Sequence, residues 1–436
     1  MRFIQMCKNI WRIEDLRTRL LITALFVLIY RFGSFIVLPG IDPTDLTNLH
    51  SQTEGGLMAL LDMFSGGAFS NASIFALGIM PYISASIVVQ LLSIAVPYFQ
   101  KMQKEGESGR QKMNQITRYL TVLILLLQGP GYLKNLEMQM GANFSLGFFV
   151  TSTILLAAGS MFVMWLGERI TDRGVGNGIS FIILIGIIAR LPQALSQEFV
   201  YRFTGQGGLI MFILEILILV AVLAFAIMLV QGTRRIPVQY AKRIQGNKQY
   251  GGVRQYIPLK VNAANVMPII FAQAIMFIPI AIMMAADPMT AAHMDNDGFW
   301  YNLVFALLII AFTYFYTAII INPVQMAENL KVNNGFIPGV KPGKKTAEYI
   351  DTVMSRIVLP GSILLAIIAI LPAIARVAFG MTSGFAQFFG GTSLLIMVGV
   401  VLDTLQQIES HLLMRHYDGF FESGMRIKGR TGAMAY

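Results

Sequence analysis

The sequence is poor in charged residues and in cysteine, and each shortage excludes a class of protein. Only 13% of its 436 residues are charged, well below the roughly 25% that is usual in a soluble domain. Cys7 is the single cysteine, so a disulfide framework and a cysteine-rich metal site are both excluded. The few histidines form no zinc-binding pattern; they are His50, His293, His411 and His416. We therefore expect neither a metal nor any other cofactor.

Long apolar runs take the place of those features. The chain is 55% hydrophobic and its mean hydropathy is +0.63. A membrane-spanning helix needs about 20 mainly apolar residues, and ten segments approach or meet that length. The third of them is short and is interrupted by Gly129-Pro130-Gly131. The predicted spans are 20–38, 74–96, 119–133, 146–165, 179–195, 209–230, 266–286, 303–321, 358–375 and 393–413.

The basic residues orient these spans. Most of the 33 Lys and Arg lie near the two termini and in alternate links between spans, and cytoplasmic loops are the ones enriched in such residues. An even number of spans puts both termini on that same side. Residues 1–19 form a charged amphipathic segment without a cleavage site, which predicts a helix on the cytoplasmic membrane surface. Residues 414–436 form a cytoplasmic tail.

Ten spans divide into two halves of five, 20–195 and 209–413. An odd number of spans per half inverts one half relative to the other, and such folds place a functional pathway between the halves. The predicted fold is therefore an all-α membrane protein with a central pore between inverted five-helix halves. No clear sequence repeat relates the halves, so this prediction depends on the number of spans.

One stretch departs from the pattern of simple spans. Residues 57–64 are apolar but too few to cross a membrane, and Gly66-Gly67 follows them. The next span carries polar residues and a proline. Together they indicate a re-entrant half-helix, which is tolerated at membrane depth only inside protein or beside a water-filled cavity. The alternative is an interfacial helix beside an ordinary span.

No motif for catalysis is present. The glycine-rich sequence 339–346 resembles a phosphate loop, but Pro338 replaces its first glycine and Lys345 its serine or threonine. The sequence Gly174-Val175-Gly176-Asn177-Gly178 follows no strand, so we interpret it as a tight turn that opens the fifth span. The chain is not expected to be an enzyme, and any energy must come from a partner or a gradient.

Two long cytoplasmic loops, 233–260 and 329–350, carry more basic residues than are needed to orient the spans, for which a few near the membrane are enough. Both join spans of the second half, so they can project into the cytoplasm together. Their basic residues would attract an acidic protein or a nucleic-acid phosphate, although a solvated surface is the simpler alternative. The candidate docking residues are Arg234, Arg235, Lys242, Arg243, Lys341, Lys344 and Lys345.

Six motifs, in matching order along nearly the whole chain, resemble the SecY family, the pore subunits of the bacterial Sec translocase. They lie at 64–68, 75–86, 104–110, 174–180, 235–243 and 390–395. The resemblance implies a channel in the bacterial inner (plasma) membrane that passes unfolded polypeptides and releases transmembrane segments sideways into lipid. It also implies binding of signal sequences and four partners, the small subunits SecE and SecG, the motor ATPase SecA and the ribosome.

The resemblance also assigns roles to residues. Residues 55–70 match the plug that closes the resting pore, with Leu57, Leu60, Leu61, Met63, Phe64, Gly66 and Gly67 as its members. The aliphatic ring at the pore's waist is matched by Ile79, Ile83, Ile179, Ile183, Ile270 and Ile396. The spacing supports this in part, since both N-terminal pairs stand i, i+4 on one helix face. The lateral gate is matched by Ser84, Gln128 and Asn262.

One residue departs from the family pattern. The family usually has arginine in the loop before the ninth span, at the position of Lys341. Lysine keeps the charge but lacks the planar fork that binds a carboxylate with two bonds. The strength of contact with a motor at this position is therefore open.

A secondary transporter for a small solute is the main alternative function. Such a transporter needs charged or coordinating groups near the midplane. The candidate intramembrane charges Arg31, Glu215 and Asp403 form no evident trio in the sequence, and the expected waist is aliphatic. A membrane scaffold without a pore does not account for the half-helix.

Overall fold

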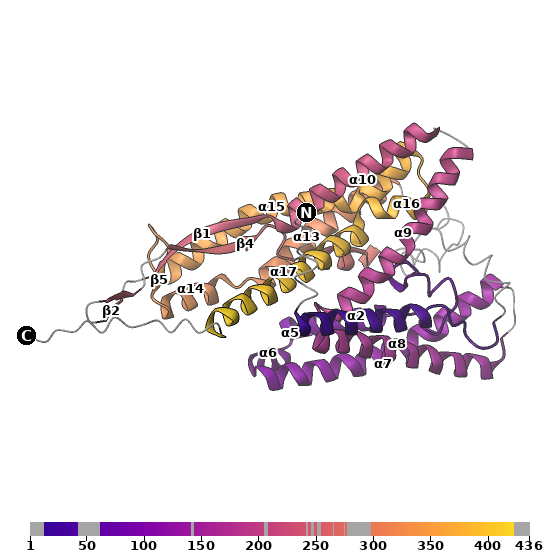
Figure 1. Ribbon diagram of the computed structural model, residues 1–436, viewed down its shortest axis with the longest axis horizontal. Coiled ribbons are helices and arrows are strands. Elements are labelled where there is room, and N and C mark those ends of the chain that lie inside the picture. The colour runs from indigo at the N-terminus through magenta and orange to yellow at the C-terminus, as the bar shows by residue number, and fades with distance from the viewer. Residues whose placement is uncertain are drawn as a thin grey trace, which may run out of the picture.

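The computed structural model describes residues 13–41, 62–140, 144–204, 208–240, 243–245, 248–250, 254–264, 266–273, 275–276 and 298–422. It is mainly helical (Figure 1). The first half contains helices α2 (Glu14–Gly33), α5 (Met80–Ala95), α6 (Pro97–Lys104), α7 (Glu107–Met140), α8 (Leu146–Arg173) and α9 (Gly178–Thr204). The second half contains α10 (Gly208–Gln231), α13 (Phe299–Ile320), α14 (Pro323–Val332), α15 (Lys344–Phe379), α16 (Ser383–Ala386), η2 (Gln387–Phe389) and α17 (Gly391–Glu422).

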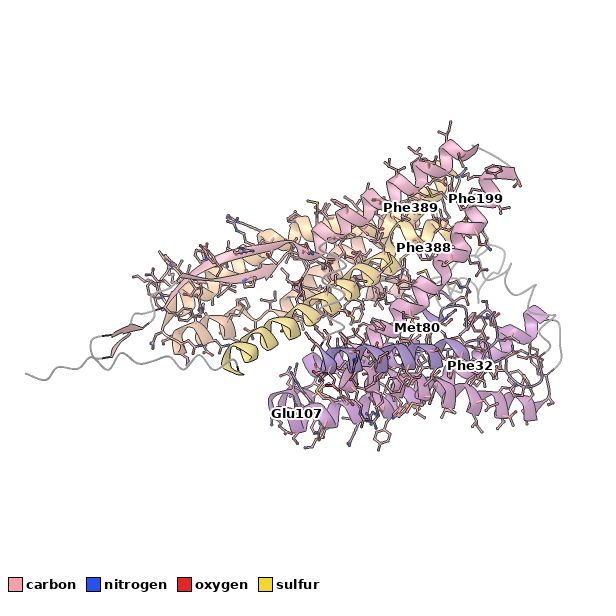
Figure 2. The ribbon with its side chains drawn as sticks, in the orientation of Figure 1. Phe32, Met80, Glu107, Phe199, Phe388 and Phe389 are labelled. Atoms are coloured by element: carbon pink, nitrogen blue, oxygen red, sulfur yellow. The ribbon has the colours of Figure 1, made fainter. Side chains whose placement is uncertain are left out.

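Within the described residues, seven helices are long and apolar enough to cross a membrane. The number is eight if α5 and α6, which are bent by 101° at their break, form one span. The first predicted span corresponds to α2, and most of the seventh lies outside the described residues. The chain is thus a multi-pass membrane protein, while the count of ten spans is only partly confirmed. Apolar side chains cover its outer surface, Phe32 and Phe199 among them (Figure 2).

Three predicted boundaries differ from the structure. Helix α2 begins at Glu14 and continues without a break into the first predicted span, so residues 14–19 form no separate helix, while residues 1–12 lie outside the described residues. The second span becomes helical only at Met80, because residues 66–79 form turns and Pro81 lies at the start of α5. Helix α7 passes through Pro130 without a break; proline removes one helical bond but often only kinks a long helix.

Loop 233–260 contains strands that were not expected from the sequence. Strand β1 (Thr233–Tyr240) pairs antiparallel with β4 (Arg254–Lys260), in a register that joins Thr233 to Lys260. On its other edge β1 pairs with β5 (Gly335–Phe336). The short strands β2 (Arg243–Gln245) and β3 (Lys248–Tyr250) form a separate hairpin. Loops 233–260 and 329–350 therefore lie together, as expected from their positions in the second half.

This sheet packs on the end of the second half because apolar and polar side chains alternate along its strands, which gives it one apolar face. Ile236 and Val238 of β1 and Leu259 of β4 are buried against α14 and α15. Residues two apart on a strand share one face, so the intervening Arg235 and Pro237 are exposed. The same alternation leaves the basic side chain of Arg235 on the outer face.

The largest apolar cluster lies where the two halves meet. It joins Tyr30 of α2, Ile170 of α8 and Ile187 of α9 to Phe385 and Ile396 of the second half. Met80, the first residue of α5, lies between the two groups of helices in Figure 2. A separate cluster fills the second half around α13 and α15.

Candidate functional site

Five of the six predicted ring isoleucines belong to this central cluster. Ile79, Ile183 and Ile396 are buried, with 2%, 6% and 7% of their surface exposed, and Ile83 and Ile179 pack against them. They come from three places, the start of α5, helix α9 and helix α17. Ile270 is partly buried and is not among the members of the cluster.

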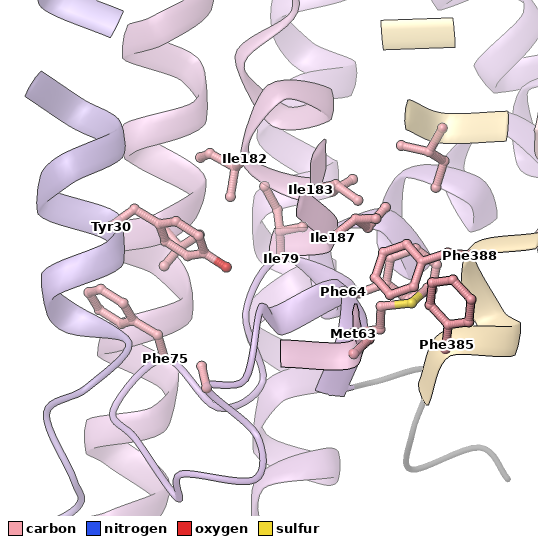
Figure 3. Close-up of a cluster of buried hydrophobic side chains, with 14 of the residues drawn as sticks. Tyr30, Met63, Phe64, Phe75, Ile79, Ile182, Ile183, Ile187, Phe385 and Phe388 are labelled. Atoms are coloured by element: carbon pink, nitrogen blue, oxygen red, sulfur yellow. The ribbon is translucent and has the colours of Figure 1, made fainter. Parts of the chain in front are cut away.

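The cluster also contains a residue that the sequence analysis missed. Ile187 is fully buried on α9, one turn beyond Ile183, and Figure 3 shows both beside Ile79. The i, i+4 spacing of Ile179 and Ile183 continues to Ile187, so this signal was available in the sequence.

The described part of the predicted plug packs into the same cluster as the predicted ring. Met63, Phe64 and Ala68 belong to the central cluster, and Met63 and Phe64 lie beside Phe385 and Phe388 in Figure 3. Residues 62–65 are helical and residues 66–70 form turns. Three predicted plug residues, Leu57, Leu60 and Leu61, lie outside the described residues.

Glycine is required at the turn after this short helix. Gly66 has φ +65°, which favours glycine, and a Cβ on it would lie 2.8 Å from the Cα of Gly186 on α9. Gly67 follows with φ +91°. The Gly66-Gly67 pair thus lets the segment turn directly against α9.

Polar side chains from the first half hold the carbonyls of this turn. The Tyr30 hydroxyl donates to the Ser65 carbonyl at 3.0 Å, and Arg31 Nη1 donates to the Gly66 carbonyl at 2.8 Å. The Tyr132 hydroxyl donates to the Phe69 carbonyl at 2.9 Å. A buried carbonyl without a partner is costly, so these bonds allow irregular backbone to remain inside the protein. From the sequence, Arg31 was expected only as a candidate intramembrane charge of a small-solute transporter.

The predicted gate residues are not joined to one another in the described part of the chain. Ser84 is partly buried on α5, Gln128 is exposed on α7, and Asn262 is buried after β4. No hydrogen bond joins these three side chains where the structure describes them, and Asn262 Oδ1 has no partner there.

The two halves instead meet through α5 and α13. The Tyr316 hydroxyl donates to Gln90 Oε1 at 2.8 Å. Around this bond, Ile87 and Leu91 of α5 pack against Ala264, Phe271 and Tyr316 of the second half. Gln90 is one of the polar residues of the predicted span 74–96, and nothing in the sequence pairs it with Tyr316.

Another contact between the two halves is held by buried charges. Arg202 of α9 donates to Glu198 Oε1 at 2.9 Å, to Glu215 Oε1 of α10 at 2.5 Å and to the Phe379 carbonyl at 2.6 Å. Glu198 Oε2 accepts from the backbone and hydroxyl of Thr382. Both carboxylates are fully buried. One cluster therefore joins α9 to α10 and to the α15–α16 connection.

A second contact ties α9 to the second half at its other end. The predicted tight turn is present: Gly176 has φ +81°, and Asn177 Oδ1 accepts from the backbone of Ile179 at the start of α9. The Gly176 backbone donates to Gln407 Oε1 of α17 at 3.0 Å. Helix α9 is thus anchored near both ends, whereas in the described part of the chain α5 and α13 are joined by the hydrogen bond from Tyr316 to Gln90.

The predicted docking residues lie on the sheet and beside it. Arg234 and Arg235 are exposed on β1, and Lys341, Lys344 and Lys345 are exposed at the start of α15. Lys242 lies outside the described residues, and the side chain of Arg243 is not described. The described members lie on neighbouring segments, because β1 pairs with β5, which precedes α15 in the chain.

Solved structures define the class of protein to which this geometry belongs. A structure of a protein-conducting channel matches with a TM-score of 0.60 at 16% identity and covers 94% of this chain and 95% of its own. A structure from work on the SecY plug domain, which stabilises the closed translocation channel and maintains a membrane seal, matches with a TM-score of 0.59 over the same shares. Sec61 in a canine ribosome-channel complex matches with a TM-score of 0.56, also over these shares. The fold is that of protein-conducting channels.

Sequence relatives identify the family. The chain is 43% identical to protein translocase subunit SecY of Streptomyces galbus, across 94% of this chain and 98% of the relative. It is 40% identical to the SecY subunit of Thermotoga maritima, across 98% and 99%. The SecY family model matches residues 73–405. The chain belongs to the SecY family. This family consists of channel subunits, so the protein is not an enzyme and the small-solute transporter alternative is not supported.

Proposed function

We propose that the chain is the pore-forming subunit through which unfolded polypeptides cross the membrane, with the ring isoleucines as its constriction. The observation that supports this most directly is the packing of Met63 and Phe64 against the same cluster that contains Ile79, Ile183 and Ile396. A constriction and a plug are expected to be in contact in a resting channel. Ile270 is proposed as the sixth ring residue from its place in the family pattern.

Branched aliphatic side chains suit such a constriction. They can surround an extended chain without bonding to any particular side chain, and an apolar waist excludes ions by dewetting. An aliphatic ring can therefore pass many different polypeptides and still block the ion flow that would dissipate the membrane potential.

The α5–α13 seam is the proposed lateral exit for transmembrane segments. Single interhelical hydrogen bonds in membranes are weak, on average about 0.6 kcal/mol, so the bond from Tyr316 to Gln90 can be broken as the seam opens. We place Ser84, Gln128 and Asn262 along the opened seam, where they would meet a signal sequence. The buried Arg202 cluster keeps the other side closed.

The partners follow from the family and from the basic surface. We propose SecE and SecG as small membrane subunits and SecA or the ribosome as the source of driving force, docked at Arg235 and its basic neighbours. The Sec61 structure that matches this fold was solved in a ribosome-channel complex. We propose the bacterial inner membrane as the location, with both termini in the cytoplasm.

Removal of the plug tests this function. Replacing residues 55–70 by a glycine-serine segment of equal length should leave a folded channel whose resting ion leak rises by about tenfold or more, because a barrier lower by about 1.4 kcal/mol raises a rate tenfold. The measurement is the current through purified channels in planar bilayers without substrate.

The same replacement elsewhere provides the control. A glycine-serine segment in place of residues 423–436, at the C-terminal end, should leave the leak unchanged. If the plug variant conducts no more than the parent, residues 55–70 do not seal the pore.

A further inference from the structure

Helix α9 carries the ring and the plug contact on one face. Ile179, Ile183, Gly186 and Arg190 follow at spacings of four, three and four residues, which places them along one stripe of a helix. Arg190 lies about 10 Å further along the axis than Ile183, at 1.5 Å per residue. The residue that faces the plug beyond the apolar ring is therefore a cation.

Arg190 contacts both ends of the described plug turn. Its guanidinium forms an ion pair with the Asp62 carboxylate, and its Nη2 donates to Ser70 Oγ at 2.9 Å. Asp62 Oδ1 also accepts from the Ser70 backbone at 2.8 Å. Asp62 and Ser70 are thus held together and to α9 as one unit.

Because Asp62 is buried, its ion pair with Arg190 favours the one position of the plug in which the two residues are in contact. The Asp62 side chain is only 4% exposed and its neighbours in sequence, Met63 and Phe64, lie in the apolar cluster. A buried carboxylate is costly unless it is paired, so a small shift of the plug that separates Asp62 from Arg190 is disfavoured. Once the plug has left, both charges regain water, in which an ion pair is weak. The pair therefore opposes partial displacement more than complete opening.

We propose that Arg190 is a positioning residue of this channel, an ionic latch that holds the plug beneath the ring through Asp62 and Ser70. Arg31, which bonds the Gly66 carbonyl, supports the same turn from α2. The inference rests on the proposed role of residues 55–70 as the seal. It adds that an ion pair, and not apolar packing alone, sets how often the resting channel opens.

The test uses near-isosteric variants of the full channel, Arg190→Gln and Asp62→Asn, in planar bilayers without substrate. Each should raise the open fraction by about tenfold or more, because breaking a buried pair strands the remaining polar partner. The current through one open channel should stay the same. The double variant should open no more often than the worse single variant, since both remove one interaction. Arg190→Lys should fall between wild type and Arg190→Gln.

Lys134→Gln is the matched control, since it removes an exposed cation from a pair with Glu137. It should leave the open fraction unchanged. Independent roles for Arg190 and Asp62 predict additive effects in the double variant, and a general disturbance of the pore predicts a changed current through one open channel. Either result would overturn the latch. If the plug replacement leaks while Arg190→Gln does not, the plug remains the seal and the latch is wrong. If neither leaks, the seal is wrong as well.

Discussion

Serine at the ring positions is expected to make the resting channel leak ions. Ile79, Ile183 and Ile396 are buried in the cluster that the plug contacts, and their methyl groups would keep water out of the waist. A hydroxyl at each position gives water a bonding partner and weakens dewetting. We expect the triple variant to raise the leak by at least about tenfold, which corresponds to a barrier lower by about 1.4 kcal/mol.

A matched control distinguishes the effect of serine in the ring from the effect of serine on the exposed surface of the same helix. Ile188 lies on the same helix as Ile183 but is 40% exposed, so Ile188→Ser should not change the leak. The measurement is ion flux from vesicles that contain purified channel. Equal flux for the triple variant and for Ile188→Ser would contradict the assignment of the ring.

Charge reversal at Arg235 is expected to weaken partner binding and translocation. Arg235 is exposed on β1, and arginine makes strong charge-assisted bonds to carboxylates and phosphates. Losing one such bond, worth about 1.5–3 kcal/mol, should weaken SecA or ribosome binding to Arg235→Glu by about tenfold or more at low salt. Insertion of the channel into the membrane should be unaffected, because Arg235 is exposed on a strand outside the predicted spans.

The salt dependence of binding makes this prediction specific. Exposed charges are screened beyond about 10 Å at 0.1 M salt, so the difference between wild type and Arg235→Glu should shrink as salt rises. Lys112→Glu is the control, since Lys112 is a mostly exposed lysine outside the two docking loops. Equal affinity of wild type and Arg235→Glu at low salt would exclude a docking role for this residue.

The sequence predicted the spans well where apolar length decides the structure. Helices α8 and α10 contain the spans predicted at 146–165 and 209–230, and α13 contains all but the last residue of the span predicted at 303–321. The glycine turn before α9 was expected from its residues. The family resemblance, carried by motifs, identified the channel. The local sequence was sufficient to predict these features because each is determined by residues that are close together along the chain.

Other features depended on contacts between distant residues. Arg190 and Ser70 are 120 positions apart, and Gln90 and Tyr316 are 226 apart, so no local pattern pairs them. Glu215 was considered as a transporter charge, although it pairs with Arg202. The strand pair β1–β4 was missed for another reason: the alternation of Ile236 and Val238 is a strand signal that a search for long apolar runs does not detect.

The central claim is that a polypeptide passes through the ring, and cross-linking to an arrested chain tests it most directly. Cys7 is the only cysteine, so Cys7→Ser gives a background into which single cysteines can be placed at Ile183, Ile396 or the lipid-facing Ile188. A substrate halted during translocation, with a cysteine in its middle, should form disulfides with the channel at positions 183 and 396 but not at 188. Cross-links at position 188, or none at the two ring positions while the substrate is halted, would contradict the account.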